Sequence, residues 1–385
     1  MLVYLIIGLI LLFLSYKYDY KGTVKNRDLW QFLILSFMIA VVGLRYHIGS
    51  DTVVYEWNFN TSYTPDFDVF IKDWQEYNQP LWMFVMSFCK TFFNSFVAVQ
   101  FFHAIVYNVL LMRFIKKLTR WQFTALLLAF SQIWFANSFE VLRESISAVL
   151  YMNALILLDG KKYLRYILLG VLATGFHSFA FIIFLLTPIV VNMRYKLLLI
   201  SFVIIYIVVR IIDVSIVNNA LTAISLLMSD SVADKMSLYI GQEDTTVVSL
   251  LGLVRSFFLS LLLPLLVLKY SDPEKTFYKK LLILWMIFSC MTVKIPILYR
   301  MENYLTIIYI VLLVNMIYER RIPNNALHIF SIWLVVGTVI MSFRDLYRPN
   351  NIIEYRPNVH YDCRYFPYKT IFQDPDPIRE GLDYY

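Results

Sequence analysis

Long apolar runs recur through the whole chain, and they constrain its fold more than any other feature. A run of about 20 apolar residues can cross a bilayer as a helix. Runs of that length or slightly less predict an all-α, polytopic integral membrane protein with about 12 transmembrane helices. The predicted spans are residues 2–15, 29–44, 96–113, 121–138, 144–158, 164–176, 178–192, 197–212, 247–268, 280–298, 303–318 and 325–343.

The composition excludes several other classes of protein. Apolar residues make up 59% of the 385 residues and charged residues 16%, whereas a soluble domain has about 45–50% and about 25%. This excludes a soluble enzyme and a disordered chain. A transmembrane β-barrel needs alternating apolar and polar residues, and stretches such as Leu126–Phe130 do not alternate. The three cysteines (Cys89, Cys290 and Cys363) lie too far apart for a disulfide framework or a zinc motif.

The basic residues gather in short loops between alternate spans. These loops carry a net charge of about +13, and the rest of the chain carries about −6. Basic loops stay on the cytoplasmic side of a membrane. We therefore expect both termini to lie outside and no nucleic-acid partner. The clusters are Lys17/Lys21/Lys25/Arg27, Arg113/Lys116/Lys117/Arg120, Lys161/Lys162/Arg165, Arg194/Lys196, Lys269/Lys275/Lys279/Lys280 and Arg320/Arg321.

The domain organisation follows from these spans. Residues 1–343 are expected to form a single transmembrane helical domain, with outer-face loops near 46–78 and 213–246. The polar tail, 344–385, is expected to cover the outer face. Residues 79–95 are apolar enough to span, but a span here would place every later basic cluster outside. We therefore interpret this segment as a re-entrant or interfacial helix.

The stretch 164–192 is either one long span or two short helices. About 30 residues of helix cover roughly 45 Å, which is longer than one bilayer core. We expect two half-length helices that meet at the outer face, with the break near His177 and Ser178.

Charged residues at the edge of a span are costly, so each is a candidate for a functional site. Arg45 ends the second predicted span, where it is either a snorkelling interface arginine or a binding residue. His47 and Asp51 follow it. Gly49 permits a tight turn between them, which could direct Asp51 back towards the membrane.

Two further arginines lie beside glutamates. Arg143 begins a span, where an added anion is favoured, but Glu140 and Glu144 are possible ion-pair partners. Arg300 interrupts a long apolar run, and its possible partner is Glu302.

Arg255 and Arg210 lie inside or near the ends of other spans, and each alone could be structural. Several arginines that converge without neighbouring carboxylates would form an anion site, because guanidinium groups bind phosphate oxygens in a bidentate manner. His177 lies between long apolar runs and is either a hydrogen-bonded core histidine or, beside bound phosphate, a general base. His103 and His328 are interpreted as packing residues.

No metal or cofactor is predicted. No two histidines share a ligand-like spacing, and the 11 glycines form no phosphate-binding loop. The acidic and aromatic residues of the first outer loop have two interpretations. They are an interfacial aromatic belt, or a surface on which sugars stack and form hydrogen bonds.

These residues, in this order, resemble the EpsG branch of the bacterial Wzy-type polymerases of O-antigen, capsule or exopolysaccharide. Thr52 stands where that family often has an aromatic residue. Four pieces and the ending Phe366-Pro367-Tyr368 carry the resemblance. The pieces are Gly-Leu-Arg-Tyr…Gly-Ser-Asp…Tyr at 43–55, the helix start at Arg143, Ala173…His177-Ser178, and Arg300…Tyr304.

The resemblance implies a glycosyltransferase of the bacterial cytoplasmic (inner) membrane, with its active site facing the periplasm or outside. It implies transfer of a growing glycan from undecaprenyl diphosphate to a sugar hydroxyl of an incoming lipid-linked oligosaccharide. Expected partners are these lipid-linked sugars, membrane lipid and a chain-length regulator protein. Two alternatives stay open, namely a membrane acyltransferase that modifies glycans and a transporter or flippase of lipid-linked sugars.

The site hypothesis combines the residue analysis with the resemblance and assigns three roles. The candidate bases are His177 and Asp51. The candidate diphosphate ligands are Arg143, Arg300, Arg45 and Arg255. The candidate sugar-binding residues are Tyr46, Tyr55, Glu56, Trp57 and Tyr304.

Overall fold

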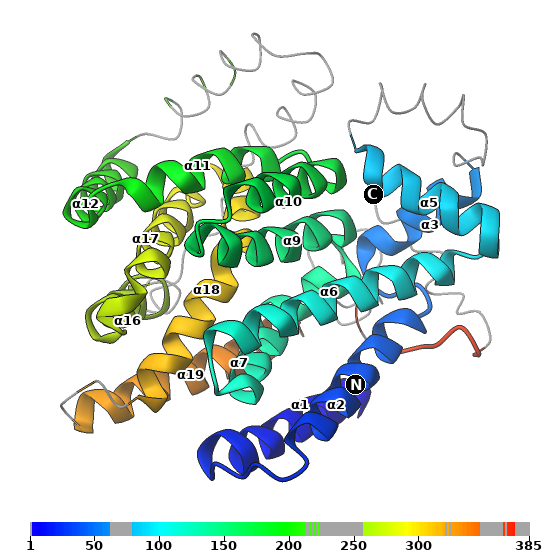
Figure 1. Ribbon diagram of the computed structural model, residues 1–385, viewed down its shortest axis with the longest axis horizontal. Helices are drawn as coiled ribbons and strands as arrows, with labels where there is room; N and C mark the ends of the chain where they lie inside the picture. The colour runs from blue at the N-terminus through cyan, green and yellow to red at the C-terminus, as the bar shows by residue number, and fades with distance from the viewer. Residues whose placement is uncertain are drawn as a thin grey trace, which may run out of the picture. The chain divides into compact units, whose positions relative to one another are not determined.

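The computed structural model is built from helices (Figure 1), which confirms the all-α prediction. Within the part of the chain that it describes, the only β-structure is an isolated bridge between Arg45 and Thr370. The described residues are 2–61, 79–212, 216, 219, 222, 257–319, 322, 325–346, 365 and 368–373.

The chain divides into two compact units. Unit 1 is Met1–Phe184 with Val335–Tyr385, and unit 2 is Leu185–Leu334. The helices that begin in the first part of unit 1 are α1 (Leu2–Leu14), the π-helix η1 (Ser15–Tyr20), α2 (Arg27–Gly43), α3 (Ser50–Thr61), α5 (Pro80–Phe93), α6 (Phe96–Leu118), α7 (Gln122–Ala129), the π-helix η2 (Phe130–Trp134), α8 (Phe135–Phe139), α9 (Leu142–Asp159), α10 (Tyr163–Phe176) and α11 (Ala180–Asn192). The remaining helices are α12 (Tyr195–Ile211), the π-helix η3 (Phe257–Leu262), α16 (Leu263–Tyr270), the 3₁₀ turns η4 (Pro273–Lys275) and η5 (Pro296–Leu298), α17 (Thr276–Met291), α18 (Tyr299–Tyr318) and α19 (Asn325–Leu346).

Close helix packing in unit 1 depends on glycine. α2 packs against α6, and α9 lies beside α10 (Figure 1). At the first contact, a Cβ on Gly43 would lie 2.6 Å from the Phe101 ring. Gly170 of α10 faces α11, where a Cβ would lie 2.8 Å from the ring of Phe184. Larger side chains would push these helices apart, so both glycines fix the helix spacing.

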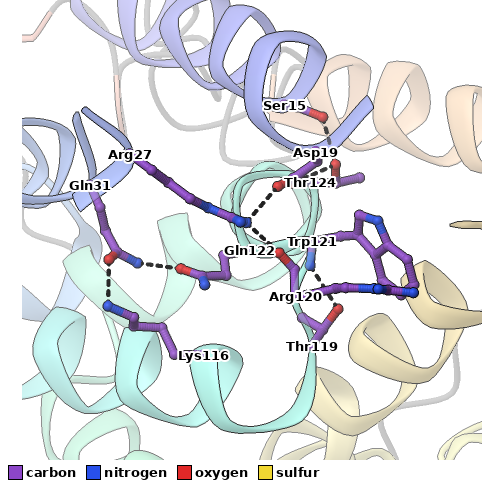
Figure 2. A network of polar contacts seen from close by, with 10 residues as sticks. All are labelled: Ser15, Asp19, Arg27, Gln31, Lys116, Thr119, Arg120, Trp121, Gln122 and Thr124. Atoms are coloured by element: carbon purple, nitrogen blue, oxygen red, sulfur yellow. Dashed lines mark hydrogen bonds and ion pairs between the residues drawn. The ribbon is translucent and has the colours of Figure 1, made fainter. Parts of the chain in front are cut away.

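A polar network joins η1, α2, α6 and α7 at one end of unit 1 (Figure 2). The buried carboxylate of Asp19 accepts hydrogen bonds from the backbone N–H (2.7 Å) and the hydroxyl (2.9 Å) of Thr124. Arg27 pairs with Asp19 at 3.2 Å. Nearby, Gln31 accepts a hydrogen bond from Lys116 at 2.7 Å and donates one to Gln122 at 2.6 Å.

This network has a consequence for membrane topology. It brings the basic loop after α1 and the basic loop after α6 to the same end of the unit. That is the arrangement that two loops on one side of a membrane require.

Apolar faces left exposed on the helices indicate a surrounding bilayer. On α10, Leu164, Leu168 and Val171 are each more than half exposed, which is costly in water. Within the described residues, three helices are long and apolar enough to cross a membrane, and five shorter apolar helices accompany them. The long ones are Leu2–Tyr20, Phe96–Leu118 and Pro296–Tyr318.

Unit 2 has α18 at its centre, because this helix is buried along most of its length. Trp285 of α17 stacks on Tyr309 of α18 at 4.8 Å between ring centroids, and its indole N–H donates to Thr306 at 3.1 Å. α17 also contacts α12 and α16.

Several sequence predictions can be compared with these helices. The break near His177 is confirmed, because α10 ends at Phe176 and α11 begins at Ala180. Residues 79–95 contain a helix, α5, as expected, while its placement in the membrane stays a prediction. The predicted span 280–298 is wrong at its end, since α17 stops at Met291 and a separate 3₁₀ turn follows. The expected loop after residue 46 contains a helix, α3, that the sequence analysis did not predict.

Candidate functional site

A tight turn connects α2 to α3 in unit 1. His47 and Gly49 both have left-handed backbone conformations, with φ of 44° and 90°. A Cβ on Gly49 would lie 1.9 Å from the carbonyl oxygen of Phe139. Only glycine therefore fits at this position, and the turn packs directly against the end of α8.

Arg45 lies inside this turn and is completely buried. It donates from Nη1 to the carbonyl oxygen of Val42 at 2.5 Å and from Nη2 to the Thr52 hydroxyl at 3.4 Å. Its guanidinium carbon lies 5.6 Å from the centroid of the Phe139 ring. Burial lowers the pKa of Arg45 to about 10, so the side chain is charged at neutral pH. None of the ion pairs among the described residues includes it.

Thr52 is a site residue that the sequence analysis did not select. It is fully buried on α3, and its hydroxyl lies 2.8 Å from the carbonyl oxygen of Ile48 and 2.9 Å from that of Phe139. The single hydroxyl hydrogen is shared between these two carbonyl oxygens or donated to one of them, while the oxygen accepts from Arg45. Its only sequence signal was its position beside Asp51 in the motif at 43–55.

Arg143 lies in the first turn of α9, as predicted, and is partly buried. Its Nε donates to the Tyr55 hydroxyl at 3.2 Å, and its guanidinium carbon lies 5.2 Å from the Tyr55 ring centroid. Within the described residues it forms no ion pair with Glu140 or Glu144. Glu140 instead accepts a hydrogen bond from Tyr365 of the C-terminal tail.

The two arginines contact one face of the same helix. Thr52 and Tyr55 are three residues apart on α3, so their side chains lie side by side. Arg45 contacts the first and Arg143 the second. The structure therefore brings together two of the four predicted diphosphate ligands.

Three of the predicted sugar-binding residues, Tyr55, Glu56 and Trp57, lie on α3, and Tyr46 lies in the turn before it. Glu56 and His47 form a 2.9 Å contact, and Tyr46 stacks on His47 at 4.1 Å between ring centroids. Trp57 is 61% exposed. Asp51 lies in the first turn of α3, where a carboxylate stabilises a helix N-terminus.

The described part of the C-terminal tail covers the backbone of the turn. The backbone N–H of Tyr46 donates to Lys369, and that of Ile371 donates to Leu44, each at 3.0 Å. The Tyr368 hydroxyl donates to the carbonyl oxygen of Val41 at 2.9 Å. Burial raises the pKa of Tyr368 to about 12, so it stays a neutral donor.

His177 lies in the connection between α10 and α11, and its side chain is buried. Its ring stacks on Phe179 at 5.6 Å between centroids. One turn earlier, the carbonyl oxygen of Ala173 accepts a hydrogen bond from Ser147 of α9 at 2.9 Å. The neighbouring Phe176 packs in the same core cluster as Tyr55. His177 is therefore held beside the helices that carry the arginine–tyrosine pair.

Lys90 fixes the other end of α3 and was also missed by the sequence analysis. Its ammonium group donates to the carbonyl oxygens of Phe59 (2.7 Å) and Asn60 (3.1 Å). A cation at these last carbonyls complements the helix dipole. A single lysine within the apolar segment 80–93 was the available signal.

The remaining predicted residues lie elsewhere. Arg300 and Tyr304 belong to α18 of unit 2, where Tyr304 is fully buried and the Arg300 guanidinium carbon lies 5.7 Å from the Tyr299 ring centroid. Arg255 lies outside the described residues. Nowhere in the described part of the chain do three or more potential ligands (His, Cys, Asp or Glu) form a group that could hold a metal.

Comparisons with known proteins give one result. The family model described as the EpsG family matches residues 28–357, which is most of the chain. No curated protein and no solved structure matches the chain.

Proposed function

The chain belongs to the EpsG family, a membrane protein family linked to polysaccharide biosynthesis, and from this premise we propose that it is a polysaccharide polymerase. It joins lipid-linked oligosaccharide repeat units on the outer face of the bacterial cytoplasmic membrane. The growing glycan moves from undecaprenyl diphosphate to a sugar hydroxyl of the incoming unit. The observation that carries this proposal is the pair of arginines that contact α3, Arg45 from the turn before it and Arg143 from α9.

These arginines suit a diphosphate leaving group. Their hydrogen bonds go to neutral hydroxyl and carbonyl oxygens. Glu56 interacts electrostatically with Arg45, but neither arginine forms an ion pair within the described residues. In the reaction the acceptor hydroxyl oxygen bonds to the anomeric carbon, and the bond from that carbon to the phosphate oxygen breaks. The electron pair stays on the diphosphate, and fixed cations stabilise the charge that develops there.

The acceptor hydroxyl must also lose its proton. His177 is our first candidate for the base, because its position beside α9 places an imidazole near the Arg143 helix. Asp51, which opens α3 between the turn and Tyr55, is the second.

The acceptor sugar requires an exposed surface with aromatic and acidic groups. Trp57, Tyr46 and Glu56 supply these on and beside α3. Sugar rings stack on aromatic faces, while carboxylates accept hydrogen bonds from hydroxyl groups. Arg300 and Arg255 stay proposed diphosphate ligands, and Arg255 lies outside the described residues.

The test is a gel of lipid-linked and surface glycan from cells with and without this chain. We expect deletion to leave only single repeat units. Arg143→Ala and His177→Ala should likewise abolish long glycan while the protein stays in the membrane. Arg113→Ala, which removes an exposed arginine of α6, is the matched control and should preserve long glycan.

Other outcomes would assign a different function. Long glycan that lacks a substituent would indicate a membrane acyltransferase. Repeat units that accumulate on the cytoplasmic side would indicate a transporter. Normal chain length from Arg143→Ala would contradict the role of the arginine pair.

A further inference from the structure

An open groove of about 700 Å³ lies between α5 and α6 in unit 1. Its lining is almost entirely apolar. Phenylalanine dominates it, with Phe84, Phe88, Phe93, Phe101 and Phe102. Phe84 and Phe88 are about half exposed, so the groove could not remain open to water without a large cost.

Two parts of the groove lining also contact residues near the arginine pair. On one wall, Phe101 touches Gly43, which lies two residues before Arg45. On the other wall, Val85 and Cys89 line the groove and also pack in the core cluster that contains Tyr55.

The arginine charges and the apolar lining together indicate what kind of molecule the groove binds. Arg45 and Arg143 are cations that form no ion pair within the described residues. The apolar groove lies near them, because its lining residues contact Gly43 and the cluster of Tyr55. This combination complements a molecule with an anionic head and an apolar tail.

We propose that the groove binds the apolar chain of a polyprenyl diphosphate whose diphosphate lies at Arg45 and Arg143. This assignment rests on the proposed function, because it takes the lipid diphosphate from it. α5 and α6 then hold the donor lipid in place while its headgroup reacts. Lys90 contributes by anchoring α3 to α5, so that the arginine contacts and the groove keep a fixed spacing.

The experiment uses the full chain in lipid nanodiscs and a polyprenyl diphosphate with a diazirine on its chain. After illumination, labelled peptides are identified by mass spectrometry. We expect adducts within residues 84–105. Unlabelled polyprenyl diphosphate should compete for them, and the same excess of phosphatidylglycerol should not.

A matched pair of variants sharpens the result. Val97→Trp fills the groove and should lower labelling by about tenfold, as expected when part of the buried chain is excluded. Leu168→Trp adds the same bulk to the exposed face of α10 and should leave the labelling unchanged. Phe88→Leu, a smaller change, tests the groove if Val97→Trp does not fold.

Two outcomes would overturn the assignment. One is labelling spread equally over α10 and α12, and the other is equal competition by phosphatidylglycerol, because either result makes the groove an ordinary lipid contact. Specific labelling in a protein that makes no polymer would keep the groove assignment and reject the polymerase proposal. The two proposals therefore fail separately.

Discussion

Arg27 and Arg45 lie at opposite ends of one helix and have different partners. α2 separates them by roughly 25 Å. Arg27 pairs with the buried carboxylate of Asp19, within the network in Figure 2. Arg45 is more deeply buried, but its described partners are the Val42 carbonyl oxygen and the Thr52 hydroxyl.

A structural arginine and a candidate binding arginine therefore differ in their partners. At Arg27 the positive charge is neutralised and the ion pair joins α2 to η1. At Arg45 the charge is kept next to α3, and the hydrogen bonds that orient it go to neutral partners. A buried cation without a carboxylate is costly for folding, so its retention favours a role in binding an anion.

The largest expected effect comes from removing the charge at Arg45. Arg45→Met should lower polymer formation by about 10²–10³-fold, because a fixed donor to the leaving group is lost. Its thermal stability should be unchanged or higher, because an apolar side chain of similar size replaces a buried charge. Glycan gels and thermal unfolding of the purified protein measure the two effects. If Arg45→Met lost stability and formed normal polymer, Arg45 would be a structural arginine like Arg27.

A second prediction concerns the turn that holds Arg45. Gly49→Ala should lower the free energy of unfolding by about 3 kcal/mol, because the added Cβ meets the Phe139 carbonyl in a left-handed turn. Gly22→Ala is the control, since Gly22 is also left-handed (φ 70°) but has nothing within 4 Å of the added Cβ. It should cost about 1 kcal/mol. Equal losses in denaturant unfolding would show that the contact with Phe139 is unimportant.

At the other end of α2, removing the charge of Arg27 should lower stability and leave polymer formation unchanged. Arg27→Met leaves Asp19 buried without its cation and should destabilise the protein by about 1–3 kcal/mol. Polymer formed per folded molecule should stay normal. Thermal unfolding combined with glycan gels tests this, and adding Asp19→Asn should recover part of the lost stability. A polymer defect with intact folding would give the network a role in function.

The smallest expected effect is at Tyr55. Tyr55→Phe removes the hydroxyl that accepts from Arg143 but keeps the ring beneath the guanidinium. One hydrogen bond to a charged group contributes about 1.5 kcal/mol, so polymer formation should fall by about tenfold. Tyr151→Phe, a buried tyrosine of α9 outside this contact, is a control for hydroxyl loss. An effect as large as that of Arg45→Met would make Tyr55 itself a substrate-binding residue.

Local sequence signals predicted part of the fold well. The helix break at His177 followed from a length argument, since one helix over 164–192 would exceed a bilayer core. The early end of α17 at Met291 could not be predicted, because the following residues are apolar and hydropathy carries no information on a change to 3₁₀ geometry. The helix α3 was missed because its polar residues match neither a span nor a strong amphipathic pattern.

The candidate site was predicted in its residue types but not in its contacts. Arg45, Arg143 and Tyr55 were all selected from the sequence, yet the arginine–tyrosine pair joins residues 88 positions apart. Glu140 was a plausible ion-pair partner of Arg143 by spacing. In the structure it binds Tyr365, more than 200 residues away.

Hydropathy and charge act locally, so the sequence already indicates a helical, apolar chain with arginines at the edges of its spans. Which arginines have a carboxylate partner depends on how distant helices pack together, and this is visible only in the folded structure. Gly43 and Gly49 illustrate the reason. At each, an added Cβ would lie within 3 Å of another segment. Such close approaches hold Arg45 against Thr52, where it forms no ion pair with a described carboxylate.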